Sequence, residues 1–174
     1  SGMHGFGLLS SPHIVRIFNL SAFRHLVDLG GGTGHLAIAA CERYGALRAT
    51  VFDLPGATDQ AREHIAASPA AARLSASEGD FFTDPLPPAD LYALGRILHD
   101  WSEDKIRLLL ARVFAALPPG GGILLAETLL GEDRAGPLHA LMQSLNMLVC
   151  TEGRERTAAE YQALLEQAGF TRVE

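Results

Sequence analysis

A glycine-rich turn near the N-terminal end constrains the fold of this chain more than any other stretch. Residues 26–29 are mostly apolar and predict a short buried strand, after which Gly30, Gly32 and Gly34 follow at alternate positions. From His35 onward the apolar residues recur at helical spacing. Because glycine is costly inside a strand or a helix, the stretch predicts a strand, a tight turn and a helix. Such a turn brings bare backbone and a helix N-terminus close to a ligand.

The spacing of the glycines helps to choose that ligand. A dinucleotide fingerprint has the form G-x-G-x-x-G, and its third glycine would fall where this chain has His35. The chain instead has Asp28 followed by Gly30, Gly32 and Gly34. This arrangement resembles the S-adenosylmethionine (SAM) site of class I methyltransferases, which implies that Asp28, Gly30 and Gly32 contact SAM.

The rest of the chain alternates predicted strands with predicted helices. We expect strands at residues 26–29, 48–54, 74–78, 90–94 and 123–127, and helices at 12–20, 35–44, 58–67, 102–117, 137–149 and 157–169. We also expect a loop at residues 3–11, a buried apolar face on the helix at 137–149, and the start of a further strand at 170–173. The alternation implies an α/β, Rossmann-like fold with a mostly parallel, twisted sheet and helices on both faces.

Composition excludes several classes of partner. The 174 residues suit one domain, and 14 basic against 20 acidic residues give a formal net charge of −6. Nucleic acid or an anionic membrane is therefore not expected as the main partner. Cys41 and Cys150 lack metal-ligand spacing, so we expect reduced thiols, no metal and a cytoplasmic location. The sequence has no apolar run long enough to span a bilayer and no visible secretory signal.

Two further acids are expected at the same edge of the sheet, because the carboxyl ends of parallel strands converge there. Asp53 ends the second predicted strand, where its two oxygens can accept both ribose hydroxyls; an exposed turn acid before Pro55 is the alternative. Asp80 and Phe81 follow the third strand. In class I methyltransferases the matching acid meets the adenine amino group and the next apolar residue covers the ring, although Phe81 could equally belong to the core. These acids suit a sulfonium cation better than a pyrophosphate.

The segment after the fourth predicted strand carries a more specific resemblance. Its sequence is Arg-Ile-Leu-His-Asp-Trp, at residues 96–101. With four other motifs in the same order, it resembles the caffeate and hydroxyindole (acetylserotonin) family of SAM-dependent small-molecule O-methyltransferases. The other motifs lie at residues 52–55, 79–82, 126–128 and 153–157, and residues 142–148 are especially similar to the animal acetylserotonin branch. The resemblance covers nearly the whole chain.

The resemblance implies transfer of a methyl group to a hydroxyl of a small aromatic molecule, with His99 as general base between Glu127 and Glu155. The chemistry asks for such residues independently. A phenol has a pKa near 10 and needs help to lose its proton at neutral pH. Histidine titrates near that pH, and neighbouring carboxylates aim it and stabilise its charged form. A helix-capping or core histidine and solvated surface glutamates are the alternatives for these three residues.

The resemblance also implies further contacts with the cofactor and the substrate. Leu54 and Arg96 are expected at the cofactor, although Arg96 could instead be a surface cation. Asp100, Asn146 and Cys150 are expected at the substrate, although Asp100 could touch the cofactor or cap the following helix. Asn146 and Cys150 lie one helical turn apart and face the same way. The animal enzymes have an Asn and a Gln at this pair, so Cys150 puts the hydroxyindole substrate in doubt.

The expected domain organisation is a lead-in loop and helix at residues 1–24 and a SAM-binding catalytic domain at 25–174. Ser1 and Gly2 resemble the remnant of a cleaved tag. Members of the family carry an N-terminal dimerisation domain and a final antiparallel strand, and both are expected to be missing here. A homodimer is therefore expected for the full-length protein.

Two other functions stay open at this stage. One is a SAM-binding module without catalysis, against which the retained His99, Glu127 and Glu155 argue. The other is a nicotinamide-dependent oxidoreductase on a similar sheet, against which His35 at the third-glycine position argues.

Overall fold

The computed structural model describes the backbone of residues 2–174 and the side chains from residue 10 onward. The chain divides into two compact units. The first, which we call the sheet unit, comprises Ser1–Gly95 and Leu117–Leu125. The second, which we call the His99 unit, comprises Arg96–Ala116 and Ala126–Glu174. Each unit is described by itself.

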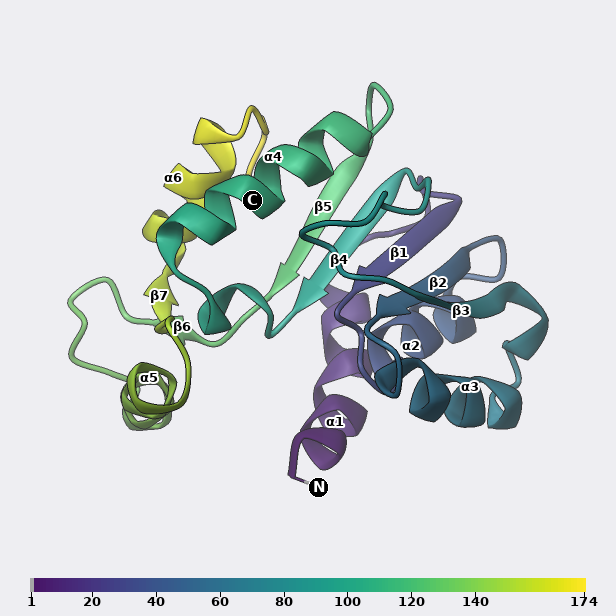
Figure 1. The fold of residues 1–174 in the computed structure, drawn as a ribbon, viewed down its shortest axis with the longest axis horizontal. Helices are drawn as coiled ribbons and strands as arrows, with labels where there is room; N and C mark the ends of the chain where they lie inside the picture. The colour runs from purple at the N-terminus through teal and green to yellow at the C-terminus, as the bar shows by residue number, and fades with distance from the viewer. Residues whose placement is uncertain (1) are drawn as a thin grey trace. The chain divides into compact units, whose positions relative to one another are not determined.

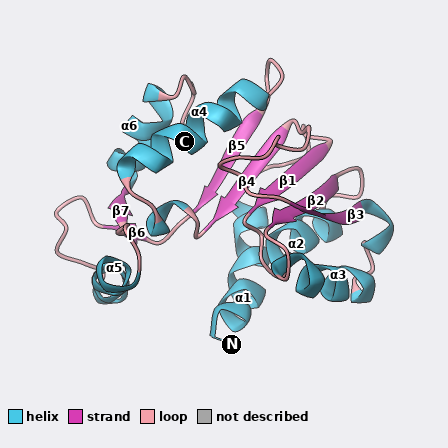
Figure 2. Ribbon diagram, viewed as in Figure 1, coloured by secondary structure: helices cyan, strands magenta, loops and turns pink. Residues whose placement is uncertain are grey.

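Within the described residues, the sheet unit is built on a five-stranded sheet in the order β3-β2-β1-β4-β5 (Figures 1 and 2). The strands are β1 (His25–Leu29), β2 (Arg48–Asp53), β3 (Leu74–Glu78), β4 (Leu91–Gly95) and β5 (Gly122–Ala126). The pairs β1–β2, β1–β4 and β2–β3 are parallel. The strand order reverses between β1 and β4, and open α/β sheets bind their ligands at the carboxyl ends of strands beside such a reversal.

The helices of the sheet unit pack around a continuous apolar core. They are α1 (Gly2–Ile17), α2 (His35–Arg43) and α3 (Ala57–Ala67), with a single 3-10 turn η1 at Ala71–Arg73. Core side chains from β1, β2 and β4 lie against those of α2 and α3, including Leu26, Val51, Ala93, Ala37 and Ala61. The mostly parallel α/β fold predicted from the sequence is confirmed. Each of its five strands begins and ends within a single residue of the predicted position.

The N-terminal helix α1 differs from the expectation of a loop at residues 3–11 and a helix only from residue 12. The helix begins at Gly2 and continues through Pro12 to Ile17. Glycines and a proline predicted a loop by local preference, but tertiary contacts hold the C-terminal part of the helix. Val15 is buried, and the Tyr44 hydroxyl donates to the Val15 and Phe18 carbonyl groups, at 3.0 Å in each case.

The His99 unit consists of helices, one 3-10 turn and a short parallel strand pair. Its elements are η2 (Leu98–Asp100), α4 (Glu103–Ala116), β6 (Leu129–Leu130), α5 (Leu138–Cys150), β7 (Arg156–Thr157) and α6 (Ala158–Gln167). The predicted capping box opens α6: the Thr157 hydroxyl accepts from the Glu160 amide at 3.2 Å, and the Glu160 carboxylate accepts from the Thr157 amide at 2.9 Å. No helix within the described residues is both long and apolar enough to cross a membrane.

Two expectations for this unit were wrong. Residues 170–174 form no strand; Gly169 turns the chain at φ 105°, and the Phe170 ring packs edge-on against Phe114. The apolar face of α5 is also not buried. Its large side chains are exposed by half or more at Leu138, Met142, Leu145, Leu148 and Val149, whereas Ala140 and Met147 are buried. Periodicity identified the apolar face, but it carries no information on what covers that face.

Candidate functional site

The glycine turn after β1 has a backbone that side chains would not permit. Gly30, Gly32 and Gly34 all have left-handed φ angles, of 67°, 54° and 79°. Gly34 immediately precedes α2, and a Cβ atom there would lie 3.0 Å from the Val51 side chain. The Gly30 amide donates to the Phe52 carbonyl at 2.8 Å, which ties the turn to the end of β2. The turn therefore needs glycine for its conformation and for its close approach to β2.

Asp53 is fixed against this turn by backbone amides. Its Oδ2 accepts from the Gly32 amide at 2.8 Å and its Oδ1 accepts from the Leu54 amide at 2.7 Å. Each carboxylate oxygen has two lone pairs, so both oxygens keep capacity for a further donor. The Leu54 side chain is 55% exposed beside them. The structure thus brings together three of the residues expected at the cofactor.

Asp28, by contrast, lies beneath the turn. It is 2% exposed, and a Cβ atom on Gly31 would lie 2.7 Å from its Oδ2. Oδ2 is a buried oxygen without a hydrogen-bond partner. Burial raises the pKa of Asp28 to about 7; the Ala37 amide opposes the rise, and the charge of Asp53 adds to it. A direct contact between Asp28 and the cofactor stays a prediction.

Asp80 and Phe81 follow β3 at the same sheet edge as Asp53. The Gly79 amide donates to the Asp53 carbonyl at 3.0 Å, which joins the ends of β2 and β3. Asp80 Oδ1 accepts from the Phe82 amide at 2.8 Å, and the Phe81 and Phe82 rings meet edge-on at 4.8 Å. The topology therefore assembles the acids at 53 and 80 on one edge of the sheet unit, as the parallel strands predicted.

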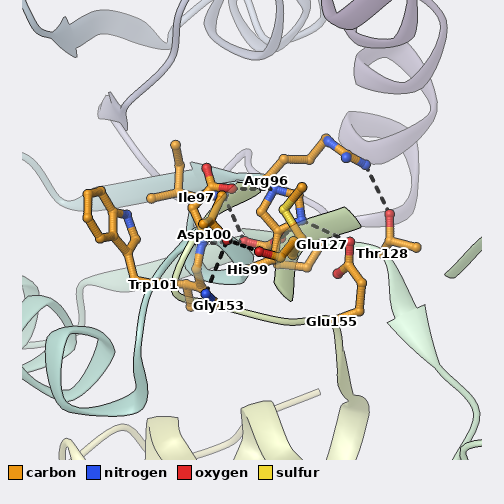
Figure 3. A network of polar contacts seen from close by, with 12 residues as sticks. Arg96, Ile97, His99, Asp100, Trp101, Glu127, Thr128, Gly153 and Glu155 are labelled. Atoms are coloured by element: carbon orange, nitrogen blue, oxygen red, sulfur yellow. Dashed lines mark hydrogen bonds and ion pairs between the residues drawn. The ribbon is translucent and has the colours of Figure 1, made fainter. Parts of the chain in front are cut away.

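His99 lies in the turn η2 of the other unit and is almost fully buried at 3% exposure. Its Nδ1 lies 2.9 Å from Glu155 Oε1 and 3.9 Å from Glu127 Oε2 (Figure 3). Because an ionised carboxylate only accepts hydrogen bonds, Nδ1 donates to Glu155. In the neutral imidazole the other nitrogen, Nε2, then carries the lone pair. Nε2 lies 3.6 Å from Asp100 Oδ1, which belongs to a half-exposed side chain.

The two glutamates have different partners. Glu155 binds the imidazole, whereas Glu127 Oε1 accepts from the amides of Ile97 at 2.9 Å and Leu98 at 2.8 Å. Burial raises the pKa of Glu127 to about 7; the charge of His99 and these two amides oppose the rise, and the charge of Glu155 adds to it. Glu127 thus holds the backbone that leads into the turn, and Glu155 holds the side chain that the turn presents.

The carboxylates around His99 determine its charge state. Burial by itself lowers the pKa of the imidazole, but the hydrogen bond to Glu155 and the charges of Glu127, Glu155 and Asp100 together outweigh burial, and the pKa is raised. His99 is therefore charged below this raised pKa and neutral above it. The arrangement stabilises an imidazolium that forms when His99 takes up a proton.

Ligand geometry alone would also let this cluster hold a cation. His99, Glu127 and Glu155 each offer one atom, and these atoms lie within 4.8 Å of one another. All three ligating groups already have partners, since His99 Nδ1 is bonded to Glu155 Oε1 and Glu127 Oε1 accepts two amides. Coordination would compete with these hydrogen bonds, so the hydrogen-bonded network accounts for the contacts better than a metal site does.

The remaining predicted residues are also in the His99 unit. Arg96 has a left-handed φ of 59°, and its guanidinium donates to Thr128 Oγ1 at 3.1 Å (Figure 3). The Cys150 thiol donates to Asn146 Oδ1 at 3.5 Å on the exposed part of α5. Asn146 and Cys150 thus face the same way, as expected. Their contact with substrate stays a prediction, as does that of Arg96 with the cofactor.

The chain matches the O-methyltransferase domain family over residues 1–171. It belongs to this family. The chain is 52% identical to acetylserotonin O-methyltransferase from Bos taurus over 172 residues, which cover 99% of this chain and 50% of the bovine protein. A human protein described as a probable bifunctional dTTP/UTP pyrophosphatase/methyltransferase is 49% identical over 172 residues, 99% of this chain and 28% of that protein.

Solved structures agree with the assignment to the O-methyltransferase domain family. Human N-acetylserotonin methyltransferase in complex with SAM superposes with a TM-score of 0.90 at 46% identity, over 95% of this chain and 47% of that one. An O-methyltransferase family 2 protein from Planctomyces limnophilus in complex with apigenin gives a TM-score of 0.93 at 30% identity, over 99% and 55%. The chain therefore spans about half the length of the acetylserotonin relatives that it matches.

Two functional candidates of this O-methyltransferase domain escaped the sequence analysis. Arg156 is 2% exposed and donates to the carbonyl groups of Leu98 and Trp101, at 3.3 Å in each case. Gly153 packs so closely on the turn that a Cβ atom there would overlap the His99 carbonyl oxygen. Both belong to the motif at residues 153–157, but local pattern does not reveal which of its arginines is buried.

Proposed function

We propose that this chain is the catalytic part of a SAM-dependent O-methyltransferase that transfers a methyl group to a hydroxyl of a small aromatic molecule. The observation that carries the proposal is the buried His99, held at Nδ1 by Glu155 with Nε2 left for a substrate proton. In this proposal residues 1–24 are a lead-in and residues 25–174 the SAM-binding catalytic domain.

The sheet unit has the features that a SAM site requires. SAM supplies a methyl group already activated by its sulfonium. Asp53 offers oxygen lone pairs for the ribose hydroxyls, and exposed Leu54 offers an apolar surface for the adenine. Asp80 adds negative charge, and Asp28 adds it above its raised pKa of about 7; both suit the cationic sulfonium and ammonium groups, and Asp28 Oδ2 is an unpaired buried acceptor. We assign Gly30, Gly32, Phe81 and Arg96 to the same cofactor.

The His99 unit supplies the proton chemistry in this proposal. His99 Nε2 takes the proton from the substrate hydroxyl as the oxygen attacks the methyl group in line. The proton stays on the imidazole, and Glu155 at Nδ1 stabilises the positive charge that forms. Placement supplies much of the remaining rate enhancement. Asp100 lies at Nε2 and, with Asn146 and Cys150, is proposed to contact the substrate.

The wider setting is part of the same proposal. A small aromatic hydroxyl compound is the substrate, the formal net charge of −6 argues against nucleic acid or a membrane as partner, and the full-length protein is a homodimer. The free Cys41 and Cys150 fit a cytoplasmic location. The cofactor requires no metal.

The first experiment is a calorimetric titration of the chain with S-adenosylhomocysteine, with NAD as the control ligand. Micromolar binding of S-adenosylhomocysteine without binding of NAD supports the cofactor assignment. Binding of NAD alone, or of neither ligand by the full-length protein, overturns it.

The second experiment measures methyl transfer from labelled SAM to a panel of phenols by the full-length protein. We expect His99→Gln to lower kcat by ~100-fold or more, because a general base contributes roughly 10²–10⁴. Exposed His13 offers the matched control, and His13→Gln should behave as the unmodified protein does. Undiminished transfer by His99→Gln would show that another group removes the proton.

A further inference from the structure

The turn that carries His99 is too short to fix its own geometry. Within η2 the Asp100 amide donates to the Ile97 carbonyl at 3.2 Å, and the Trp101 amide donates to the Leu98 carbonyl at 3.3 Å. Hydrogen bonds in a single 3-10 turn have poor geometry, so such a turn depends on outside partners for its orientation. The direction in which His99 presents Nε2 therefore depends on what holds this turn.

Arg156 holds the turn at both ends. Its Nη1 donates to the Leu98 carbonyl, immediately before His99, and its Nη2 donates to the Trp101 carbonyl, two residues after it, at 3.3 Å in each case. Nη1 also donates to the Arg154 carbonyl at 3.1 Å, which joins the turn to the segment before β7. The Leu98 and Trp101 carbonyl groups that accept from Arg156 thus lie on either side of His99 in the sequence.

The planar guanidinium is suited to this arrangement. It presents several N–H groups in a fixed fork and can reach two carbonyl groups at a defined separation, whereas a lysine ammonium is a single flexible point charge. The side chain is also almost fully buried, so neither carbonyl finds water as an easy substitute partner. A lysine at this position keeps the charge but not the two-point contact.

The loop that precedes Arg156 reinforces the contact. Gly153 lies against the turn backbone, where a Cβ atom would overlap the His99 carbonyl oxygen and would lie 2.6 Å from the Asp100 carbonyl carbon. Lys105 pairs with Glu152 and lies 4.7 Å above the centre of the Trp101 ring. Gly153, Glu155 and Arg156 thus contact the turn or its imidazole directly, and Glu152 is linked to the residue after the turn through Lys105.

We propose that Arg156 is a positioning residue that fixes the turn carrying the base and thereby the aim of His99 Nε2 at the substrate hydroxyl. This inference rests on the proposed function only in treating His99 as the general base. The geometry is independent of that function: Arg156 binds the backbone on either side of His99, at Leu98 and Trp101, and its sequence neighbour Glu155 binds the imidazole. Weakening the contacts of Arg156 with the turn should therefore lengthen the hydrogen bond between His99 Nδ1 and Glu155.

The test combines kinetics with nuclear magnetic resonance of the His99 imidazole, whose signals are identified by their loss in His99→Gln. In Arg156→Lys we expect kcat to fall roughly 10–100-fold, since small misplacements at a reacting centre cost about this much. KM for SAM should change less than about twofold, because Arg156 lies outside the assigned cofactor site. The imidazole should titrate closer to its ordinary pKa of 6.5, because its bond to Glu155 weakens.

Arg107→Lys is the matched control. Arg107 lies on α4 in the same unit, is half-exposed and pairs with Glu103, so neither kcat nor the imidazole signals should change. Gly153→Ala is a second variant, whose added methyl group would collide with the His99 carbonyl oxygen and displace the turn. It should alter the His99 signals even if Arg156→Lys folds poorly.

The outcomes separate the two proposals. Unchanged His99 signals and an unchanged pH profile in a folded Arg156→Lys, together with unchanged signals in Gly153→Ala, overturn the positioning role. Loss of thermal stability without any change in the imidazole would assign Arg156 a purely structural role and also overturns it. If the full-length protein transfers no methyl group but the His99 signals shift as expected, the positioning inference holds and the proposed function fails.

Discussion

The turn after β1 and the turn around His99 both present polar groups, but they fix those groups in different ways. In the sheet unit, backbone amides of adjacent residues and strand ends orient Asp53. In the His99 unit, charged side chains from distant parts of the sequence orient the imidazole and its turn. The first arrangement follows from local conformation, and the second exists only after tertiary packing. A substitution should therefore affect ligand affinity in the first region and proton chemistry in the second.

The two glutamates offer the sharpest test of how the His99 region works. Glu155→Gln replaces the charged partner of Nδ1 by a neutral amide, and we expect kcat to fall by roughly 10–100-fold, because the imidazolium loses its charged acceptor. The pH at which activity reaches half its maximum should fall, since the hydrogen bond to Glu155 raises the pKa of His99. Activity rises with pH as the base loses its proton, so the variant reaches its plateau at lower pH.

Glu127→Gln is the counterpart of that substitution. An amide oxygen can still accept from the Ile97 and Leu98 amides, so the variant should keep the turn in place and lose less activity than Glu155→Gln. Steady-state kinetics of both variants between pH 5 and 9 measure the difference. Equal losses of kcat with equal shifts of the pH profile would mean that Glu155 and Glu127 do not have the separate roles that their contacts indicate.

Asp53 gives the matching test for the sheet unit. Asp53→Asn places an NH₂ group against one of two backbone donors, so we expect affinity for S-adenosylhomocysteine to fall by roughly 10-fold. The turnover rate at saturating SAM should change less than the affinity. Calorimetry measures the binding, and Asp59→Asn on α3, where the carboxylate is 73% exposed, is the control. A loss of kcat with unchanged affinity would break the distinction between the two regions.

The sequence allowed prediction of one region far better than of the other. Residues 26–34 predicted a strand, a glycine turn and a helix, because alternating glycines and helical spacing are local signals. The parallel order of the strands then predicted that Asp53 and Asp80, which follow strand ends, lie at one edge of the sheet. In the His99 unit the family motif drew attention to His99, Glu127 and Glu155, but their contacts could not be derived from spacing. Glu127 lies two residues before β6 and Glu155 lies one residue before β7, and these two strands pair in parallel across a long sequence separation.

The failures have the same physical origin. Residues 170–173 have the composition of a strand, but a strand needs a neighbouring strand, and Phe170 packs on Phe114 instead. The apolar face of α5 was expected in the core because apolar residues usually are, yet periodicity does not identify the covering partner. Arg156 was not singled out among the arginines of its motif for the same reason. Burial and pairing at long range are properties of the packed chain rather than of a local pattern.

Asp28 predicts how the stability of the sheet unit depends on pH. Its pKa is about 7 when folded, against an ordinary 3.8, so between these values the folded state holds a proton that the unfolded state has lost. Stability therefore falls as pH rises from about 4 to 7 and levels off above that range. Asp28→Asn is a neutral mimic and should be more stable than the unmodified chain at pH 8, by up to about 4 kcal/mol.

Urea unfolding at pH 4 and pH 8 measures this effect. The advantage of Asp28→Asn should be much smaller at pH 4, where the folded carboxyl group is neutral and the unfolded one is about half ionised. Asp59→Asn controls for the removal of an exposed charge. An advantage independent of pH would mean that the buried carboxyl does not titrate as its surroundings indicate.

Metal removal should have the smallest effect. The atoms that His99, Glu127 and Glu155 offer lie close enough together to ligate a cation, but the imidazole and Glu127 already use their hydrogen bonds to hold the turn. Incubation of the full-length protein with EDTA should change methyl transfer by less than about twofold, because neither the activated methyl group nor the proton transfer needs a metal ion. Addition of Zn²⁺ should inhibit, since a cation at Nδ1 would displace Glu155 and disfavour the charged imidazolium. Loss of activity with EDTA and its return with one particular metal would instead identify the cluster as a metal centre.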